Sequence, residues 1–122
     1  MKRILVVEDD QYIRELYELL LKEAGLEVEA VADGETGLSK AKEGGYDLIL
    51  LDILLPGKDG LTVLKELKKY PPLKENKKII MLTALDRDEF VKSAMRMGAD
   101  GYLIKSSLNP DDVVNEVMAF LK

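Results

Sequence analysis

The sequence contains no cysteine and no histidine. Without cysteine, the chain can form no disulfide framework, no thiolate nucleophile and no zinc site with cysteine ligands. Without histidine, it has no imidazole that could serve as a general base, as part of a catalytic triad or as a metal ligand. Any chemistry must therefore come from carboxylates, hydroxyls, lysines or a bound ion.

Long apolar runs and an excess of basic residues are also missing. No apolar run reaches the roughly 18 residues needed to cross a bilayer, and the N-terminal segment meets Glu8, Asp9 and Asp10 too early for a signal peptide. We therefore expect a cytoplasmic protein without membrane insertion. The 18 Lys and Arg against 23 Asp and Glu give a net charge of −5, which disfavours direct binding to nucleic acid, because Lys and Arg dominate contacts to phosphates.

The chain has the length and apolar content of one ordinary domain, which we expect to span residues 1–122. Its 122 residues are 47% hydrophobic, which suffices for a core that needs no disulfide or metal. Continuous apolar runs or apolar alternation predict five strands, at residues 4–7, 26–31, 48–51, 79–82 and 102–104.

Helices are predicted between the strands from apolar stripes at helical spacing. The stripe of the first helix consists of Ile13, Leu16, Tyr17, Leu20, Leu21 and Ala24. Asp33 and Asn109 are placed to cap the second and last helices, and the fourth helix is expected over residues 86–97. Strands that alternate with helices require a mostly parallel sheet with helices on both faces, so the predicted fold class is α/β.

Five side chains at strand ends form the candidate site. Glu8 and Asp9 follow the first strand, Asp52 the third, Thr83 the fourth and Lys105 the fifth. Each side chain alone is also typical of a helix cap, a turn or a solvated strand end. Together they belong to one edge of the sheet, where open α/β sheets bind their ligands. We therefore interpret them as a single site.

The chemistry of this set favours a divalent cation and a phosphoryl group. Three crowded carboxylates repel one another and are tolerated when a cation lies among them. Oxygen ligands without His or Cys favour Mg²⁺, which binds through few carboxylates together with phosphate oxygens. Lys105 and Thr83 could then bind phosphoryl oxygens, and a carboxylate could attack phosphorus.

Four segments resemble the receiver domain of two-component response regulators, and the chain is similar in layout to stand-alone chemotaxis regulators. They are Val7-Glu8-Asp9-Asp10, residues 51–60 with the sequence Leu-Asp-Ile-Leu-Leu-Pro-Gly-Lys-Asp-Gly, Leu82-Thr83-Ala84, and residues 101–105 with the sequence Gly-Tyr-Leu-Ile-Lys. The resemblance implies a doubly wound (βα)5 flavodoxin-like three-layer sandwich. Its five-stranded parallel sheet would have the order 2-1-3-4-5.

The resemblance also implies that Asp52 accepts a phosphoryl group from a histidine of a partner kinase or phosphotransfer protein. The reaction would require Mg²⁺ or Mn²⁺. Asp9 and Asp52 would hold this ion directly, Glu8 would act mostly through a water, and the backbone carbonyl of Leu54 would complete the protein ligands.

Thr83 and Lys105 would bind the phosphoryl oxygens. Thr83 and Tyr102 would form a switch in which the hydroxyl moves towards the phosphoryl group and the aromatic ring turns inward. The output surface for a downstream protein would then be the fourth helix, the fifth strand and the fifth helix. On the residues alone, Tyr102 is equally consistent with a half-buried strand aromatic.

Three features of the sequence depart from the family pattern. Ser106 replaces the proline, usually preceded by a cis bond, that follows the lysine in most receivers. Either the bond to Ser106 is trans and the loop shifts, or the fold sustains a strained bond. The run at residues 98–101 lacks the acid pair of regulators that dimerise, so we expect a monomer. Apolar Leu54 and Leu85 replace polar residues that help to place the hydrolytic water, so we expect slow self-dephosphorylation.

Two other functions compete with the receiver. A phosphatase or phosphotransferase with an Asp nucleophile typically has a second Asp two residues later as general acid, and here that residue is Leu54. A flavodoxin-like binding module that works without phosphorylation is disfavoured by the intact set at the strand ends. We therefore expect no enzyme acting on a separate substrate, only a domain that promotes its own phosphorylation and dephosphorylation.

Overall fold

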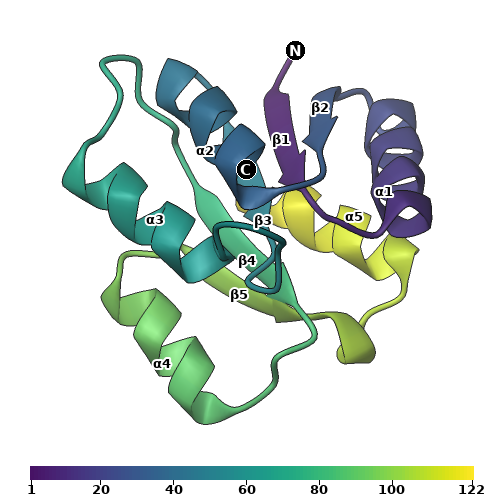
Figure 1. Cartoon of the computed structure of the whole chain (residues 1–122). Coiled ribbons are helices and arrows are strands. Elements are labelled where there is room, and N and C mark those ends of the chain that lie inside the picture. Colours follow the sequence, from purple (N-terminus) through teal and green to yellow (C-terminus); the bar gives the residue numbers. More distant parts are fainter.

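Five parallel strands form one sheet with helices on both faces (Figure 1). The computed structural model covers residues 1–122. The strand order is β2-β1-β3-β4-β5, which confirms the flavodoxin-like α/β architecture implied by the resemblance. In chain order the elements are β1 (Arg3–Val7), α1 (Gln11–Glu23), β2 (Glu27–Val31), α2 (Gly34–Glu43), β3 (Leu48–Leu51), α3 (Gly60–Lys69), β4 (Ile79–Thr83), α4 (Asp88–Arg96), β5 (Gly101–Ile104), the 3-10 turn η1 (Lys105–Ser107) and α5 (Pro110–Phe120).

Successive strand residues point alternately into two separate hydrophobic cores, one on each face of the sheet. In β1, Ile4 and Val6 pack with α1 and α5 on one face, and Leu5 and Val7 pack with α2, α3 and α4 on the other. Figure 1 shows these two helical layers on opposite sides of the sheet. Because both faces are covered, all four of these side chains are buried, which explains why the strand is a continuous apolar run in the sequence.

Short polar side chains begin four of the five helices at the carboxyl edge of the sheet. Asp10, Asp33, Asp59 and Asn109 each accept a hydrogen bond from the backbone N–H three residues later. This contact satisfies one of the unpaired donors of the first helical turn. The caps predicted at Asp33 and Asn109 are confirmed.

The structure corrects the predicted start of the fourth helix and decides between the two alternatives for the bond to Ser106. The fourth helix begins at Asp88 rather than at Asp86, because Arg87 occupies the N-cap position and makes no capping hydrogen bond through its side chain. No peptide bond is cis, so the Lys105–Ser106 bond is trans. The loop after β5 instead forms η1, in which the Leu108 N–H donates to the Lys105 carbonyl at 3.2 Å.

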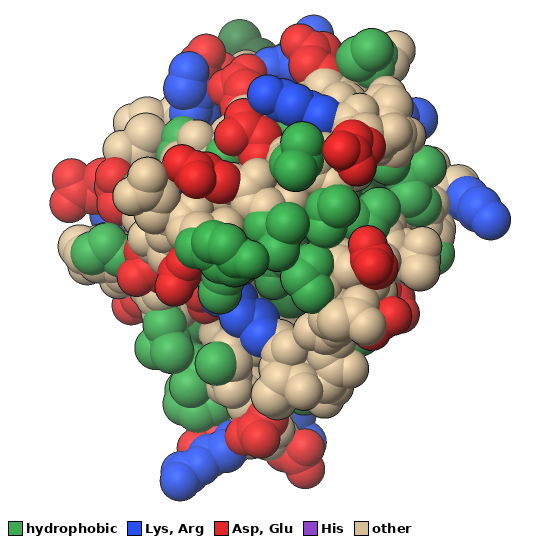
Figure 2. All heavy atoms as spheres, turned by 90° about the vertical axis from the view of Figure 1, so that its right-hand side faces the viewer, with side chains coloured by type: hydrophobic (Ala, Val, Ile, Leu, Met, Phe, Trp, Pro, Cys, Tyr) green, Lys and Arg blue, Asp and Glu red, His purple; other side chains and the backbone are tan.

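The face that α1 and α5 form carries exposed apolar side chains. Figure 2 shows hydrophobic side chains gathered in a band across this face, with charged residues around them. The exposed members on the two helices are Tyr12, Leu19 and Met118. None of the helices has the length and apolar character that crossing a bilayer requires.

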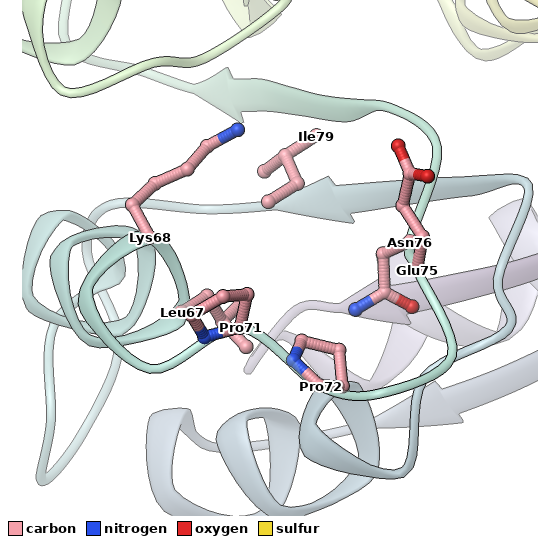
Figure 3. A pocket seen from close by; sticks show the side chains of 7 residues that line it. All are labelled: Leu67, Lys68, Pro71, Pro72, Glu75, Asn76 and Ile79. Carbon is pink, nitrogen blue, oxygen red and sulfur yellow. The ribbon is translucent and has the colours of Figure 1, made fainter.

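A hollow of about 280 Å³ lies at the amino edge of the sheet, beside the start of β4 (Figure 3). Its lining consists of Leu67, Lys68, Pro71, Pro72, Glu75, Asn76 and Ile79. The loop around it is anchored, because the Gly45 N–H donates to the Lys74 carbonyl at 3.0 Å and the Asn76 amide donates to the Ala41 carbonyl at 2.8 Å. The hollow is at the opposite end of the strands from the predicted site.

Candidate functional site

Backbone pairing places two of the predicted acids at neighbouring strand ends. The Glu8 N–H donates to the Val31 carbonyl at 3.0 Å, and the Asp52 N–H donates to the Val7 carbonyl at 3.2 Å. These bonds extend the parallel ladder past β1 and β3. Gly60 supports the position of Asp52 from α3, since a Cβ atom at Gly60 would lie 1.9 Å from the Asp52 carbonyl oxygen. Only glycine permits this close approach.

The structure brings the three predicted acids together. One carboxylate oxygen from each of Glu8, Asp9 and Asp52 lies within 4.8 Å of the other two. Glu8 is only 2% exposed and Asp52 only 4%, whereas Asp9 is exposed. Burial raises the pKa of Glu8, and the charge of Asp52 raises it further, against the opposing effect of the Lys105 ammonium. The cluster is therefore an electrostatically costly arrangement that a cation stabilises.

Lys105 supplies the internal cation of this cluster. Its Nζ atom lies 2.7 Å from Asp52 Oδ2 and also contacts Glu8 Oε1. Burial disfavours the ammonium, but the hydrogen bonds to Asp52 and Glu8 outweigh this effect and raise the pKa of Lys105 above its ordinary value. One ammonium thus offsets only one of the two buried carboxylate charges, and with Asp9 two negative charges remain for a further cation.

Thr83 and Tyr102 meet at the backbone of Leu85. Thr83 is buried at the end of β4, and its Oγ1 accepts a long hydrogen bond of 3.4 Å from the Leu85 N–H. The half-buried Tyr102 donates its hydroxyl to the Leu85 carbonyl at 2.7 Å. Neither side chain hydrogen-bonds to Asp52, so the structure links the two predicted switch residues through Leu85 and does not join them directly to the acids.

Leu54 contacts the site through its backbone. Its N–H donates to Asp52 Oδ1 at 3.0 Å, and its side chain is 53% exposed. Together with Lys105, this N–H fixes both oxygens of the Asp52 carboxylate. The role of the Leu54 carbonyl as a metal ligand stays a prediction.

Two residues at the site escaped the sequence analysis. Arg14 on α1 donates to the Glu8 carbonyl at 3.0 Å and to the Asp9 carbonyl at 3.3 Å, which holds the acidic loop against the helix. Its signal in the sequence is that it is the only basic residue between positions 4 and 21. Tyr17 lines a narrow gap beneath the site together with Glu8 and Asp52. Its hydroxyl was hidden within the apolar stripe of the first helix.

The donor set fits a hard divalent cation. Besides the predicted Leu54 carbonyl, the candidate ligands are carboxylate oxygens, and three of these converge with one exposed to solvent. Mg²⁺ prefers oxygen ligands, few carboxylates and retained waters, so a partly open cluster of this kind suits it. The geometry can therefore bind a cation beside a carboxylate whose oxygens are held in place.

Comparisons with known proteins agree with this geometry. Residues 4–118 match the family model of the response regulator receiver domain. The chemotaxis protein CheY of Treponema pallidum is 32% identical over 98% of this chain and 83% of its own length. The transcriptional regulatory protein ResD of Bacillus subtilis is 34% identical over 98% of this chain, which spans about half of ResD (48%).

A solved structure is also similar. The response regulator protein TrrA of Thermotoga maritima, in complex with Mg(2+)-BeF, matches with a TM-score of 0.81 and 41% identity over 98% of this chain and 99% of that one. Fold and sequence point to the same family.

Proposed function

Because the chain belongs to the response regulator receiver domain family, we propose that Asp52 accepts a phosphoryl group from a histidine of a partner kinase or phosphotransfer protein. An Asp52 carboxylate oxygen forms a bond to phosphorus while the bond from phosphorus to the partner's imidazole nitrogen breaks, which leaves an aspartyl phosphate. The observation that carries the proposal is the Asp52 carboxylate, held by Lys105 and the Leu54 N–H beside two further acids.

Glu8, Asp9, Asp52 and the Leu54 carbonyl are the groups that would hold Mg²⁺ or Mn²⁺. The similar protein TrrA was solved in complex with Mg(2+)-BeF, which supports this assignment. When bound, the ion neutralises negative charge on the phosphoryl oxygens.

The remaining side chains act on the phosphoryl group after it arrives. The Lys105 ammonium turns from the acids to a phosphoryl oxygen, and the Thr83 hydroxyl donates to another. Movement of Thr83 breaks its contact with the Leu85 N–H. The Tyr102 hydroxyl donates a hydrogen bond to the Leu85 carbonyl, so it is coupled to this movement. The change then reaches the surface of α4, β5 and α5, where a downstream protein binds.

The partners in this proposal are proteins. Tyr12 is an exposed apolar side chain of α1 that follows the acidic loop after Gln11, so a partner that reaches Asp52 can also cover apolar surface there.

Intact-mass spectrometry tests the proposal. The protein is incubated with Mg²⁺ and acetyl phosphate, and the wild type is compared with Asp52→Asn. We expect one added phosphoryl group in the wild type and none in the variant. A folded wild type that gains no mass while Mg²⁺ binding is detected would instead support the flavodoxin-like module that works without phosphorylation.

A further inference from the structure

Tyr17 is a buried tyrosine to which the proposed function gives no role. It lies on the inner face of α1 and is 5% exposed. Its hydroxyl makes no hydrogen bond within the chain, whereas the hydroxyls of Tyr46 and Tyr102 bond to Glu29 and Leu85. No fully buried polar side-chain atom lacks a partner, so the Tyr17 hydroxyl keeps only slight contact with solvent. A hydroxyl at this depth has little water to donate to, and an acceptor inside the protein would satisfy it more fully.

The Tyr17 side chain is directed towards the acids. Long side chains on a helix lean towards its N-terminus, and α1 begins at the carboxyl edge, immediately after Asp10. Tyr17 lines a gap that is too narrow for a water molecule, and the other polar side chains that line it are Glu8 and Asp52. One residue with a hydroxyl donor and two with carboxylate acceptors therefore line the same gap.

Electrostatics keeps the hydroxyl protonated. Burial raises the pKa of Tyr17, and the negative charges of Glu8 and Asp52 raise it further against the opposing charge of Lys105. At neutral pH the side chain is therefore a hydrogen-bond donor.

The need for this donor arises when Lys105 moves. Before phosphorylation, the Lys105 ammonium contacts both Glu8 and Asp52. When its ammonium turns to a phosphoryl oxygen, Glu8 keeps only the hydrogen bond from the Asp10 N–H at 3.1 Å. A carboxylate that is 2% exposed requires further donors. It offers about four acceptor positions, so an added bond leaves positions for the ion.

We propose that Tyr17 is a positioning residue for phosphoryl acceptance: its hydroxyl donates to the Glu8 carboxylate when Lys105 leaves to bind the phosphoryl group. The contact is direct, because the gap has no room for a bridging water. This inference rests on the proposed function and adds to it a residue that acts through Glu8.

The test compares Tyr17→Phe with Tyr46→Phe. Both variants lose one hydroxyl from a buried tyrosine and keep the ring. Tyr46 precedes β3 at the amino edge of the sheet, and its hydroxyl donates to Glu29 of β2, away from the acids. The initial rate of phosphorylation by acetyl phosphate is measured at saturating Mg²⁺, and urea unfolding is measured for each variant. We expect Tyr17→Phe to slow phosphorylation about tenfold, the scale of one hydrogen bond to a charged group, and Tyr46→Phe to stay within about twofold of the wild type.

A double-mutant cycle identifies the residue through which Tyr17 acts. In a Glu8→Gln background, adding Tyr17→Phe should change the rate less than twofold, because the carboxylate that receives the bond is gone. A Tyr17→Phe rate equal to that of the wild type, an equal loss in Tyr46→Phe, or an undiminished effect beside Glu8→Gln would each overturn the inference and leave the proposed function intact. A wild type that takes no phosphoryl group would overturn both.

Discussion

At the scale of single residues, Leu54 and Leu85 are apolar at the two positions where the family resemblance implies that polar side chains help to place the hydrolytic water. Leu54 is 53% exposed and Leu85 is half-buried, and each offers only its backbone to neighbouring polar groups. Neither side chain can hydrogen-bond a water in line with a phosphorus atom on Asp52. We therefore expect the aspartyl phosphate to hydrolyse slowly.

Replacing these leucines with polar residues should shorten the lifetime of the phosphoryl group. The double variant Leu54→Asn and Leu85→Glu supplies two side chains that can orient water, a contribution of general base and positioning groups that is typically about tenfold or more. The measurement is loss of added mass over time after the phosphodonor is removed. Decay rates that match between the variant and the wild type would contradict the expectation.

Tyr46 should contribute to the loss of stability at high pH. Burial and its 2.9 Å hydrogen bond to Glu29 raise the pKa of Tyr46 to about 12, from an ordinary value of 10.0. A group whose pKa is higher in the folded than in the unfolded chain contributes stability that is fully present below its pKa in the unfolded chain. This contribution is lost as the pH rises towards its pKa in the folded protein. The gap of about two pH units corresponds to roughly 2 to 3 kcal/mol.

The variant Tyr46→Phe isolates this contribution. Between pH 10 and 12 the free energy of unfolding of the wild type should fall more steeply than that of the variant, by about 2 kcal/mol over the interval. Urea unfolding at fixed ionic strength measures both. The titration of lysines is common to the two proteins and cancels in the difference, so parallel curves would contradict the assignment of Tyr46.

At the scale of elements, α4 is the helix without a side-chain cap. Arg87 occupies its N-cap position, with backbone angles of −72° and 139° that a capping residue adopts, yet it makes no capping bond. Arg87→Ser should therefore add a cap and stabilise the protein by about 1 kcal/mol. Asp33→Ala, which removes the cap of α2, should lower stability by a similar amount. Urea midpoints measure both changes, and no gain in Arg87→Ser would contradict the prediction.

The same elements show what the sequence could and could not predict. Strands and helices were predictable because the strands are buried on both faces and the caps at Asp33 and Asn109 have distinctive residue types. The start of α4 was placed two residues too early, at Asp86, because acids are typical of a first helical turn and both Asp86 and Asp88 fit by composition. Strand order followed from the family resemblance, since apolar runs alone do not specify which strands are neighbours.

The sequence predicted which residues form the site better than it predicted the contacts between them. Carboxylates at the ends of parallel strands must share one edge, so the acid cluster of Glu8 and Asp52 follows from the pattern. The reach of Lys105 across to both acids depends on how its side chain packs over the sheet. The direction of the Tyr17 hydroxyl depends likewise on packing, because hydrophobic spacing treats a tyrosine only as an apolar residue.

At the scale of the whole molecule, acids outnumber bases at the carboxyl edge of the sheet. Basic residues occupy the last turns of α1 to α4, at the amino edge. Acids gather at the carboxyl edge, where strands end and helices begin: Glu8, Asp9, Asp10, Asp33, Asp52, Asp59, Asp88, Asp111 and Asp112. The arrangement complements the helix dipoles and surrounds the site with negative potential.

This potential should make phosphorylation by an anionic donor depend on salt. Acetyl phosphate is repelled by the carboxyl edge, so at saturating Mg²⁺ its second-order rate should rise severalfold as ionic strength increases from about 20 to 200 mM, over which the Debye length shrinks from about 20 to below 10 Å. Initial rates by mass spectrometry measure this. A rate that is flat or falls with salt would show that repulsion does not limit the encounter.

The anchored loop at the amino edge offers a place for a fluorescent label that reports partner binding. Its tip, Leu73, is fully exposed and lies at the opposite end of the strands from Asp52. Because the chain has no cysteine, Leu73→Cys would provide the single thiol of the protein, accessible to maleimide dyes without protection of other groups. A dye attached there stays clear of the acids, of η1 and of α4, so one labelled preparation could follow partner binding by fluorescence anisotropy while the phosphorylation chemistry proceeds undisturbed.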